Sequence, residues 1–336
     1  MSCKDILTLD YQPTLSVFET QRAIKFIKDD FQHRLAEKLK LLRVSAPIFV
    51  RKDSGLNDGL NGTERPVSFN VENVQSDIEI VHSLAKWKRF ALSKYGFEVG
   101  HGLYTDMNAI RKDEKLDFIH SVYVDQWDWE KAITREDRSL SYLKKTVRQI
   151  YSCLRHCEKA LSLRYPMFQP ILPRNIEFIS TEELLQRYPL LNAKERENAI
   201  AKEYGAVFLY QIGGALSSGV PHDSRAADYD DWSLNGDILV YYPLYDMALE
   251  LSSMGIRVDA DSLRKQLKTK GEEDKLSNAY CQAILRDELP LSIGGGIGQS
   301  RICMFLLRKA HIGEVQVSVW PEEDAKKLMK RGIRLL

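Results

Sequence analysis

The sequence lacks long apolar runs. None of its 336 residues belongs to an uninterrupted apolar stretch of about eighteen residues, the length that a membrane span needs. The N-terminus, Met1-Ser2-Cys3-Lys4-Asp5, has no apolar signal core. The sequence therefore predicts neither a membrane span nor secretion, and we expect a cytoplasmic protein.

The chain also has no large excess of positive or negative residues. The chain has 48 Lys and Arg against 47 Asp and Glu, a net charge of +1, whereas proteins that bind nucleic-acid backbones draw on surplus Lys and Arg. Its 44% hydrophobic and 28% charged residues are typical of a folded globular enzyme and exclude a disordered or fibrous chain.

Cysteines are few, and the five present form no even framework, which indicates a reducing compartment. Only Cys153 and Cys157 are close together, on a helical stretch that also holds His156. A structural zinc site needs four ligands, and no second cluster supplies the others. We therefore interpret this pair as part of an ordinary helix face.

The chain has no repeat, low-complexity tract or long linker, so we expect a single catalytic domain over 1–336. Its first long helix is predicted over 20–42 by apolar residues at steps of three or four: Ile24, Ile27, Phe31, Leu35, Leu39 and Leu42. Alternation then predicts a strand over 44–50. Because Pro47 cannot donate to a sheet ladder, we expect that strand at a sheet edge or an interface.

Further patterns predict helices over 83–95 and 143–161, and strands over 119–129, 207–212 and 237–242. Within the 119–129 strand, Gln126 and Asp128 point the same way. Ser180 and Glu183 resemble a capping box. Helices and strands do not alternate one for one, which favours an α+β fold with an antiparallel sheet flanked by helices over a doubly wound fold.

Glycine is concentrated in residues 293–301, Ile-Gly-Gly-Gly-Ile-Gly-Gln-Ser-Arg. The segment fits neither a phosphate-binding P-loop nor a Rossmann motif. It instead predicts a strand that lets a flat ligand approach the backbone, followed by Arg301 on the first turn of a helix. From this segment alone, a surface role and a ligand contact are equally open for Arg301.

Two charged segments also fit either a ligand-binding role or a solvated surface. Residues 109–114 end a strand in a charged turn, and an acidic stretch holds Asp228, Asp230 and Asp231, with Asp237 and Glu250 further on. Carboxylates near phosphates suit Mg²⁺, but each segment also fits a solvated turn.

The order of these signals is more informative than any one of them. Residues 41–48, 111–114 and 294–301 resemble the three motifs of class II aminoacyl-tRNA synthetases. The strings at 82–89, 102–105, 121–130, 228–232 and 250–259 are similar to those of ammonia-dependent asparagine synthetases, the type A aspartate–ammonia ligases. The resemblance covers about residues 15–320, the expected catalytic core. It implies a class II synthetase-like fold, with residues 20–50 forming a homodimer interface.

The resemblance also implies a reaction. ATP and L-aspartate give a β-aspartyl adenylate and pyrophosphate, and ammonia then displaces AMP to give L-asparagine. The residues implied for catalysis are Asp58 on the loop 53–64, Arg111 and Gln126. Those implied for aspartate binding are Ser83, Lys88, Asp128, Ser253 and Arg257. ATP binding is implied for Arg111, Tyr229, Asp230, Asp237, Glu250 and Arg301, and Mg²⁺ binding for Asp237 and Glu250. We expect the loop 53–64 to close over the adenylate and exclude water.

The chain departs from the family pattern at Ala215, His101 and the short connection from Ser233 to Asn235, where Lys, Glu and an insertion are expected. The main alternative function is an aminoacyl-tRNA synthetase-like enzyme or tRNA-binding paralogue. The helix predicted to begin near residue 20 leaves no room for an N-terminal anticodon-binding module, so tRNA is not expected as a partner. A non-catalytic paralogue is disfavoured because Arg111 and Arg301 are both present, and a glutamine-dependent enzyme because no amidotransferase domain is evident.

Overall fold

The structure is a computed structural model that describes residues 9–60 and 64–336. Helix α2 (Val17–Leu39) begins at a capping box, in which Ser16 Oγ accepts from the Glu19 N–H and the Glu19 carboxylate accepts from the Ser16 N–H. The helix predicted over 20–42 is confirmed but ends at Leu39. Its apolar stripe is buried as predicted: Ile24, Ile27, Phe31, Leu35 and Leu39.

An eight-stranded sheet forms the centre of the described chain, in the order β1-β5-β6-β11-β10-β9-β8-β7. Its two outermost pairs, β1 with β5 and β7 with β8, are parallel, and the other pairs are antiparallel. The predicted α+β class with an antiparallel sheet is therefore confirmed. The strands are β1 (Leu41–Arg43), β5 (Gly102–Ile110), β6 (Tyr123–Ala132), β7 (Glu177–Ser180), β8 (Ala206–Tyr210), β9 (Asp230–Tyr242), β10 (Met247–Arg257) and β11 (Ser292–Gly298).

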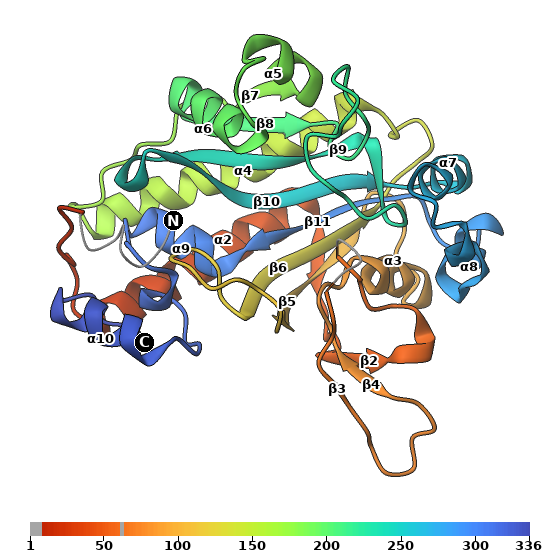
Figure 1. Ribbon diagram of the computed structural model, residues 1–336, viewed down its shortest axis with the longest axis horizontal. Helices are drawn as coiled ribbons and strands as arrows, with labels where there is room; N and C mark the ends of the chain where they lie inside the picture. Colours follow the sequence, from red (N-terminus) through yellow and green to blue (C-terminus); the bar gives the residue numbers. More distant parts are fainter. Residues whose placement is uncertain (1–8, 61–63) are drawn as a thin grey trace.

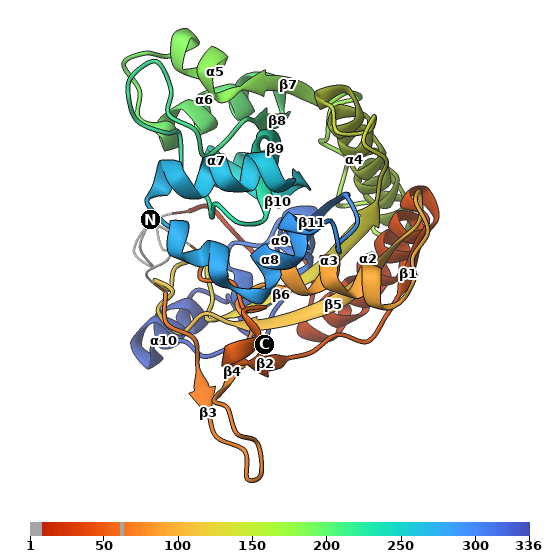
Figure 2. The same cartoon turned by 90° about the vertical axis from the view of Figure 1, so that its right-hand side faces the viewer.

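Helices cover both faces of this sheet. Figure 2 shows α2 and α4 on one side, and α5 and α6 on the other, while Figure 1 shows α7 beyond the end of β10. Among the described residues, no helix has both the length and the apolarity that crossing a membrane requires. The remaining helices are α3 (Ala85–Lys94), α4 (Leu140–Arg164), α5 (Thr181–Arg187), α6 (Ala193–Tyr204), α7 (Ala260–Lys270), α8 (Ala279–Leu285), α9 (Gln299–Leu306) and α10 (Glu322–Lys330).

Strand β6 divides its side chains between the two faces. Trp127 and Trp129 are buried in the core under α2, where the Trp127 ring lies 4.7 Å from that of Phe31. Because side chains alternate along a strand, Gln126 and Asp128 lie on the opposite face, as predicted. That face carries the polar residues described below.

A second, three-stranded sheet extends from the body (Figure 1), in the order β2-β4-β3. It consists of β2 (Phe49–Arg51), β3 (Ser68–Phe69) and β4 (Ile78–Ile80). The rings of Phe49 and Phe69 pack edge to face at 5.6 Å, and half of Phe49 is exposed.

The strand predicted over 44–50 is wrong in its boundaries. The chain leaves α2 at Lys40, whose φ of 60° turns it into β1, and β1 pairs with β5 only as far as Arg43. Pro47 lacks an N–H for the ladder, and pairing resumes in the other sheet at Phe49. Leu42, expected on the helix face, is 63% exposed on the edge strand. The edge position itself was predicted correctly.

Candidate active site

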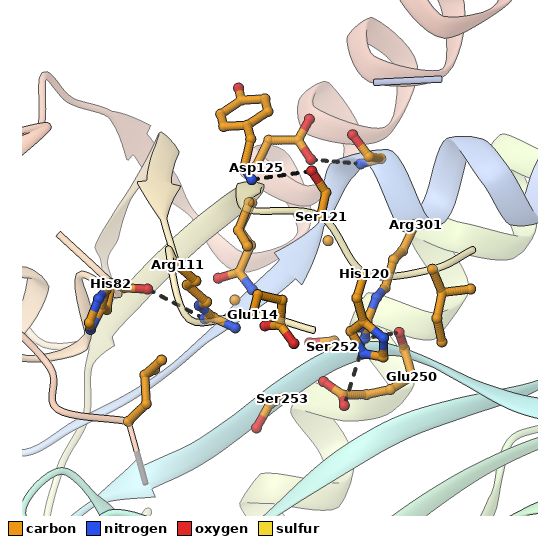
Figure 3. Close-up of a pocket in the computed structure, with 18 of the residues that line it drawn as sticks. His82, Arg111, Glu114, His120, Ser121, Asp125, Glu250, Ser252, Ser253 and Arg301 are labelled. Carbon is orange, nitrogen blue, oxygen red and sulfur yellow. Dashed lines mark hydrogen bonds and ion pairs between the residues drawn. The ribbon is translucent and has the colours of Figure 1, made fainter. Parts of the chain in front are cut away.

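A cavity of about 400 Å³ opens where β5, β6, β10 and β11 meet. Figure 3 shows Arg111 and Arg301 at two sides of it, with Glu114 and His120 between them. Six of the residues predicted for the site line the cavity: Arg111, Gln126, Tyr229, Glu250, Ser253 and Arg301. The other seven do not line it: Asp58, Ser83, Lys88, Asp128, Asp230, Asp237 and Arg257.

Arg111 follows the last residue of β5. Its backbone N–H donates to Val122 O at 2.8 Å and closes the turn that leads into β6. The side chain donates through Nη2 to His82 O at 3.3 Å, while Nε is buried and has no hydrogen-bond partner among the described residues. A fixed guanidinium with donors to spare is suited to binding an anion in the cavity.

Arg301 lies on the first turn of α9, as predicted. Its Nη1 donates to Glu250 O at 3.1 Å and lies 3.8 Å from the Glu250 carboxylate. The Arg301 side chain is 24% exposed and that of Glu250 is 41% exposed, so both can reach a ligand. The two cationic side chains therefore come from distant parts of the chain and face one cavity.

Gly296 makes room for Gln126 at the cavity floor. A Cβ atom on Gly296 would lie 2.1 Å from Gln126 Oε1, a distance that no unbonded pair tolerates. The glycine-rich strand β11 thus holds its backbone against the amide of Gln126. The close approach observed here is that of a side chain of the protein, and the approach of a flat ligand to this strand stays a prediction.

Beneath the cavity lies a buried network of five charged groups. Lys88 pairs with Asp128 and also donates to the carbonyls of Trp129 at 2.9 Å and Gly295 at 3.1 Å. Arg257 pairs with Glu130 at 2.7 Å and with Asp230. Two cations thus face three carboxylates, which leaves a surplus of one negative charge when all are ionised.

The pKa values in this network follow burial and pairing. Burial raises the pKa of Asp128, although Lys88 acts against the rise. Burial also favours a higher pKa for Glu130, but the adjacent Arg257 outweighs it and the pKa is lowered. Burial lowers the pKa of Lys88 despite its carboxylate partners. The network is held together by charge in a site that water hardly reaches.

Asp58 is buried next to the cavity rather than in an exposed turn. Its Oδ1 accepts from the Leu60 N–H at 2.9 Å, and its carbonyl lies 3.1 Å from His82 Nδ1. Within the described part of the chain, Oδ2 has no hydrogen-bond partner. Ser83 Oγ accepts from the Ala85 N–H at 3.1 Å near the start of α3. Residues 61–63 of the loop 53–64, which we expect to close over the adenylate, lie outside the described residues.

Comparison with known proteins shows which family has this sequence. The sequence pattern of the AsnA family, aspartate-ammonia ligase, matches residues 18–332. The chain belongs to this family. The aspartate–ammonia ligases of Clostridium perfringens (strain SM101) and Levilactobacillus brevis (strain ATCC 367) are 60% and 57% identical to it over 328 and 332 residues. The alignments cover 97% and 98% of this chain and 98% and 99% of those proteins.

Solved structures bear out the predicted fold. Asparaginyl-tRNA synthetase from Pyrococcus horikoshii, complexed with asparaginyl-adenylate, superimposes with a TM-score of 0.65 at 16% identity, covering 90% of this chain and 70% of that one. Aspartyl-tRNA synthetase from Entamoeba histolytica gives 0.57 at 15% identity, covering 88% and 58%. The class II synthetase-like architecture expected for the AsnA family is therefore confirmed.

The two carboxylates predicted for Mg²⁺, Asp237 and Glu250, lie on the paired strands β9 and β10. Asp237 bonds Arg225 through one oxygen, while its Oδ1 is buried without a hydrogen-bond partner in the described chain. Glu250 lies nearby on β10, and its charge helps burial to raise the pKa of Asp237 to about 7, against the effect of Arg225. The described residues contain no group of three or more His, Cys, Asp or Glu that could hold a metal. Phosphate oxygens would therefore have to complete the ligand set.

Sequence reasoning missed several polar residues at this site. His120 lines the cavity, and its Nδ1 lies 2.9 Å from Asp117. Arg225 lines it as well and holds Asp237. Asp125 lies at the cavity wall between the core face and the site. No single-residue pattern distinguishes these from solvated groups, although Asp125 lies inside a string that matches the AsnA family.

The positions that depart from the family pattern lie away from the cavity lining. Ala215 forms an isolated bridge with Pro221, and the backbone of exposed His101 bonds Glu98 and Ala132. Cys153 and Cys157 are buried on α4, which confirms their interpretation as part of a helix face.

Proposed function

We propose that the chain joins ammonia to the β-carboxylate of L-aspartate, using ATP, to form L-asparagine with release of AMP and pyrophosphate. Membership of the AsnA family supports the overall reaction. The structural observation that carries the mechanism is the pair Arg111 and Arg301, which face one cavity that also contains Gln126. Two guanidinium groups that line one cavity suit a single polyphosphate.

In the first step, an oxygen of the β-carboxylate attacks the α-phosphorus, and the bond from that phosphorus to the leaving pyrophosphate breaks. Negative charge grows on the α-phosphate oxygens. Arg111 is placed to stabilise that charge, because its Nε is buried without a partner and its Nη2 contact with His82 O is long at 3.3 Å. Arg301, beside Glu250, binds the nucleotide. Tyr229 lines the same cavity and contributes to ATP binding together with Asp230.

In the second step, ammonia attacks the acyl carbon and AMP leaves with the former carboxylate oxygen. Gln126 orients the acyl group, and Asp58 accepts the proton that ammonium must lose before it can attack. The unpartnered Asp58 Oδ2 supports this role, because a buried carboxylate oxygen without a donor is ready to accept one. Closure of the loop 53–64 would protect the adenylate from water.

The network under the cavity is proposed to select aspartate. Its surplus negative charge favours the α-ammonium, with Asp128 as the candidate carboxylate. Ser83, Ser253, Lys88 and Arg257 are proposed for the α-carboxylate. Lys88 already donates to Asp128, Trp129 O and Gly295 O, so aspartate must replace one of these bonds to bind Lys88. Arg257 bonds Glu130 and Asp230 and keeps one further N–H on each Nη nitrogen.

Mg²⁺ is proposed to lie against Asp237 and Glu250. When bound there it would neutralise charge on the ATP phosphates. Arg225 holds one oxygen of Asp237 and leaves Oδ1 available.

The reaction is tested with purified protein, aspartate labelled with ¹⁸O in its β-carboxylate, Mg-ATP and ammonium. We expect one labelled oxygen in AMP for each asparagine formed. Formation of ADP, or AMP without label, would refute the adenylate route. Transfer of an amino acid to tRNA without ammonia would favour the synthetase-like alternative.

A homodimer through residues 20–50 remains a prediction. Support comes from the edge strand β1, where Leu42 is 63% exposed, and from nearby Ile48 and Phe49, which are 54% and 51% exposed. Replacing Leu42 with Lys should halve the mass measured by light scattering. An unchanged dimer mass would show that the interface lies elsewhere, and a monomeric parent protein would refute the dimer.

A further inference from the structure

The position of Arg301 depends on how α9 is anchored. Apart from Glu250, the structure shows no hydrogen-bond or ion-pair partner for the Arg301 side chain among the described residues. Its placement therefore follows the first turn of α9. The N-cap of this helix is Gly298, which has no side chain to cap the free N–H groups.

Asp125 supplies the missing acceptor from a neighbouring strand. Its Oδ1 accepts from the Ser300 N–H at 3.1 Å, and the residue is 7% exposed. A carboxylate at a helix N-terminus is favoured by both the free N–H groups and the helix dipole. Asp125 therefore ties β6 to the turn that carries Arg301.

Two further elements hold this carboxylate in place. Lys28 of α2 donates from Nζ to Asp125 Oδ2 at 3.1 Å. Gln316 donates from Nε2 to Oδ1 at 3.2 Å and also to Ser300 Oγ at 3.1 Å. Every oxygen of the Asp125 carboxylate is thus engaged, and Lys28 balances its charge.

Asp125 also precedes Gln126 in the chain. Because side chains alternate along β6, Asp125 faces α9 and the core while Gln126 faces the acyl end of the cavity. A single strand thus connects the group proposed to orient the acyl carbonyl with the helix that carries the nucleotide arginine.

We propose that Asp125 is a positioning residue that fixes Arg301 relative to Gln126 by anchoring the first turn of α9, with Lys28 as its counter-charge. The role attributed to Arg301 rests on the proposed function. A second tie, from Gln299 Nε2 to Asp106 Oδ1 at 2.8 Å, remains when Asp125 is removed. The loss should therefore be partial.

The test compares Asp125→Ala with a matched control, Glu158→Ala. Glu158 is a buried carboxylate on α4 that accepts from the N–H groups of Ile171 and Leu172 and pairs with Arg308, and it does not line the cavity. ATP affinity is measured by calorimetry, and kcat and KM for each substrate by asparagine formation. Asp125→Ala should weaken ATP binding about tenfold and leave the KM for ammonium unchanged. Glu158→Ala should change stability only.

A double-mutant cycle with Arg301→Ala tests whether Asp125 acts through that residue. In the Arg301→Ala background, removing Asp125 should weaken ATP binding less than twofold. An equal loss in both backgrounds, or the same loss of ATP affinity in Glu158→Ala, would overturn the proposal. If Asp125→Ala does not fold, Asp125→Asn keeps an acceptor for Ser300 and gives the same cycle with a smaller expected loss of about threefold.

The calorimetric measurement of ATP affinity tests this inference independently of the proposed function. A parent protein that binds ATP but forms no asparagine would refute the function and still allow the cycle to decide the role of Asp125. A parent that forms asparagine while the cycle shows no coupling would refute the positioning role alone.

Discussion

Replacing Gly296 with Ala should impair catalysis with little change in stability. The new methyl group would lie 2.1 Å from Gln126 Oε1 and 2.7 Å from its Cδ. Such contacts do not fall below 3.0 Å in real structures, so the amide oxygen must move by about 0.9 Å. A misplacement of about 1 Å at a reacting group can cost about 10²-fold in rate, which corresponds to about 2.7 kcal/mol.

The stability of this variant should change by less than about 1 kcal/mol, because the clash is with the end of a flexible side chain beside a cavity. Gly295→Ala provides the contrast. Its methyl group would lie 2.6 Å from Ser253 O and 2.9 Å from Met254 Cα, and this backbone cannot move aside. That variant should lose about 1–3 kcal/mol of unfolding free energy.

Steady-state asparagine formation and urea unfolding measure the two quantities separately. Gly214→Ala serves as the neutral control, since nothing lies within 4 Å of the added carbon. The reasoning fails if Gly296→Ala keeps kcat within threefold of the parent, or if its crystal structure shows Gln126 in its original place.

Three further predictions concern charged groups. Arg111→Lys should lower kcat by about 10²- to 10³-fold with an unchanged melting temperature, because an ammonium cannot replace a bidentate guanidinium at the α-phosphate; AMP release measures this. Glu130→Gln should cost about 3–5 kcal/mol in urea unfolding at pH 7, because Arg257 loses a buried partner. Since pairing lowers the pKa of Glu130 below 4.5, that cost should shrink as the pH falls below this value. Asp237→Asn should remove part of the pH dependence of stability: burial raises the pKa of Asp237 from 3.8 to about 7, so the native state binds the extra proton and the parent should lose stability as the pH rises from 4 to 7.

Each of these has a clear contrary result. A normal kcat in Arg111→Lys would show that the mechanism does not need a bidentate contact from Arg111. A Glu130→Gln variant as stable as the parent would show that the buried network is not held by this pair. Parallel stability curves for Asp237→Asn and the parent between pH 4 and 7 would show that Asp237 is ionised throughout that range.

Local sequence patterns predicted the elements whose signals lie within one turn or one strand. The apolar stripe of α2, the capping box of α5 and the alternation along β6 depend on neighbours a few residues apart, and all are present in the structure. The strand over 44–50 failed because alternation does not show where a partner strand ends. Pairing with β5 stops at Arg43 and pairing with β4 begins at Phe49.

At the candidate site, too, the sequence predicted some features and only the structure showed the others. Motif order in the sequence identified Arg111, Gln126 and Arg301, and the fold brings them to one cavity. Lys88 and Arg257 also lie in matching strings, but the sequence could not show that Asp128, Glu130 and Asp230 already pair with them. Glu130 is 127 residues from Arg257 in the numbering, so only strand order makes them neighbours.

The sequence by itself therefore determined the family, the class of fold and the residue types available for chemistry, because these are recorded in motifs and short-range periodicity. The tertiary structure alone decided which charges are already paired, which oxygens remain free and which carboxylate anchors α9. The physical reason is that burial and long-range contact set the cost of an unpaired charge, and neither exists until the sheet has assembled.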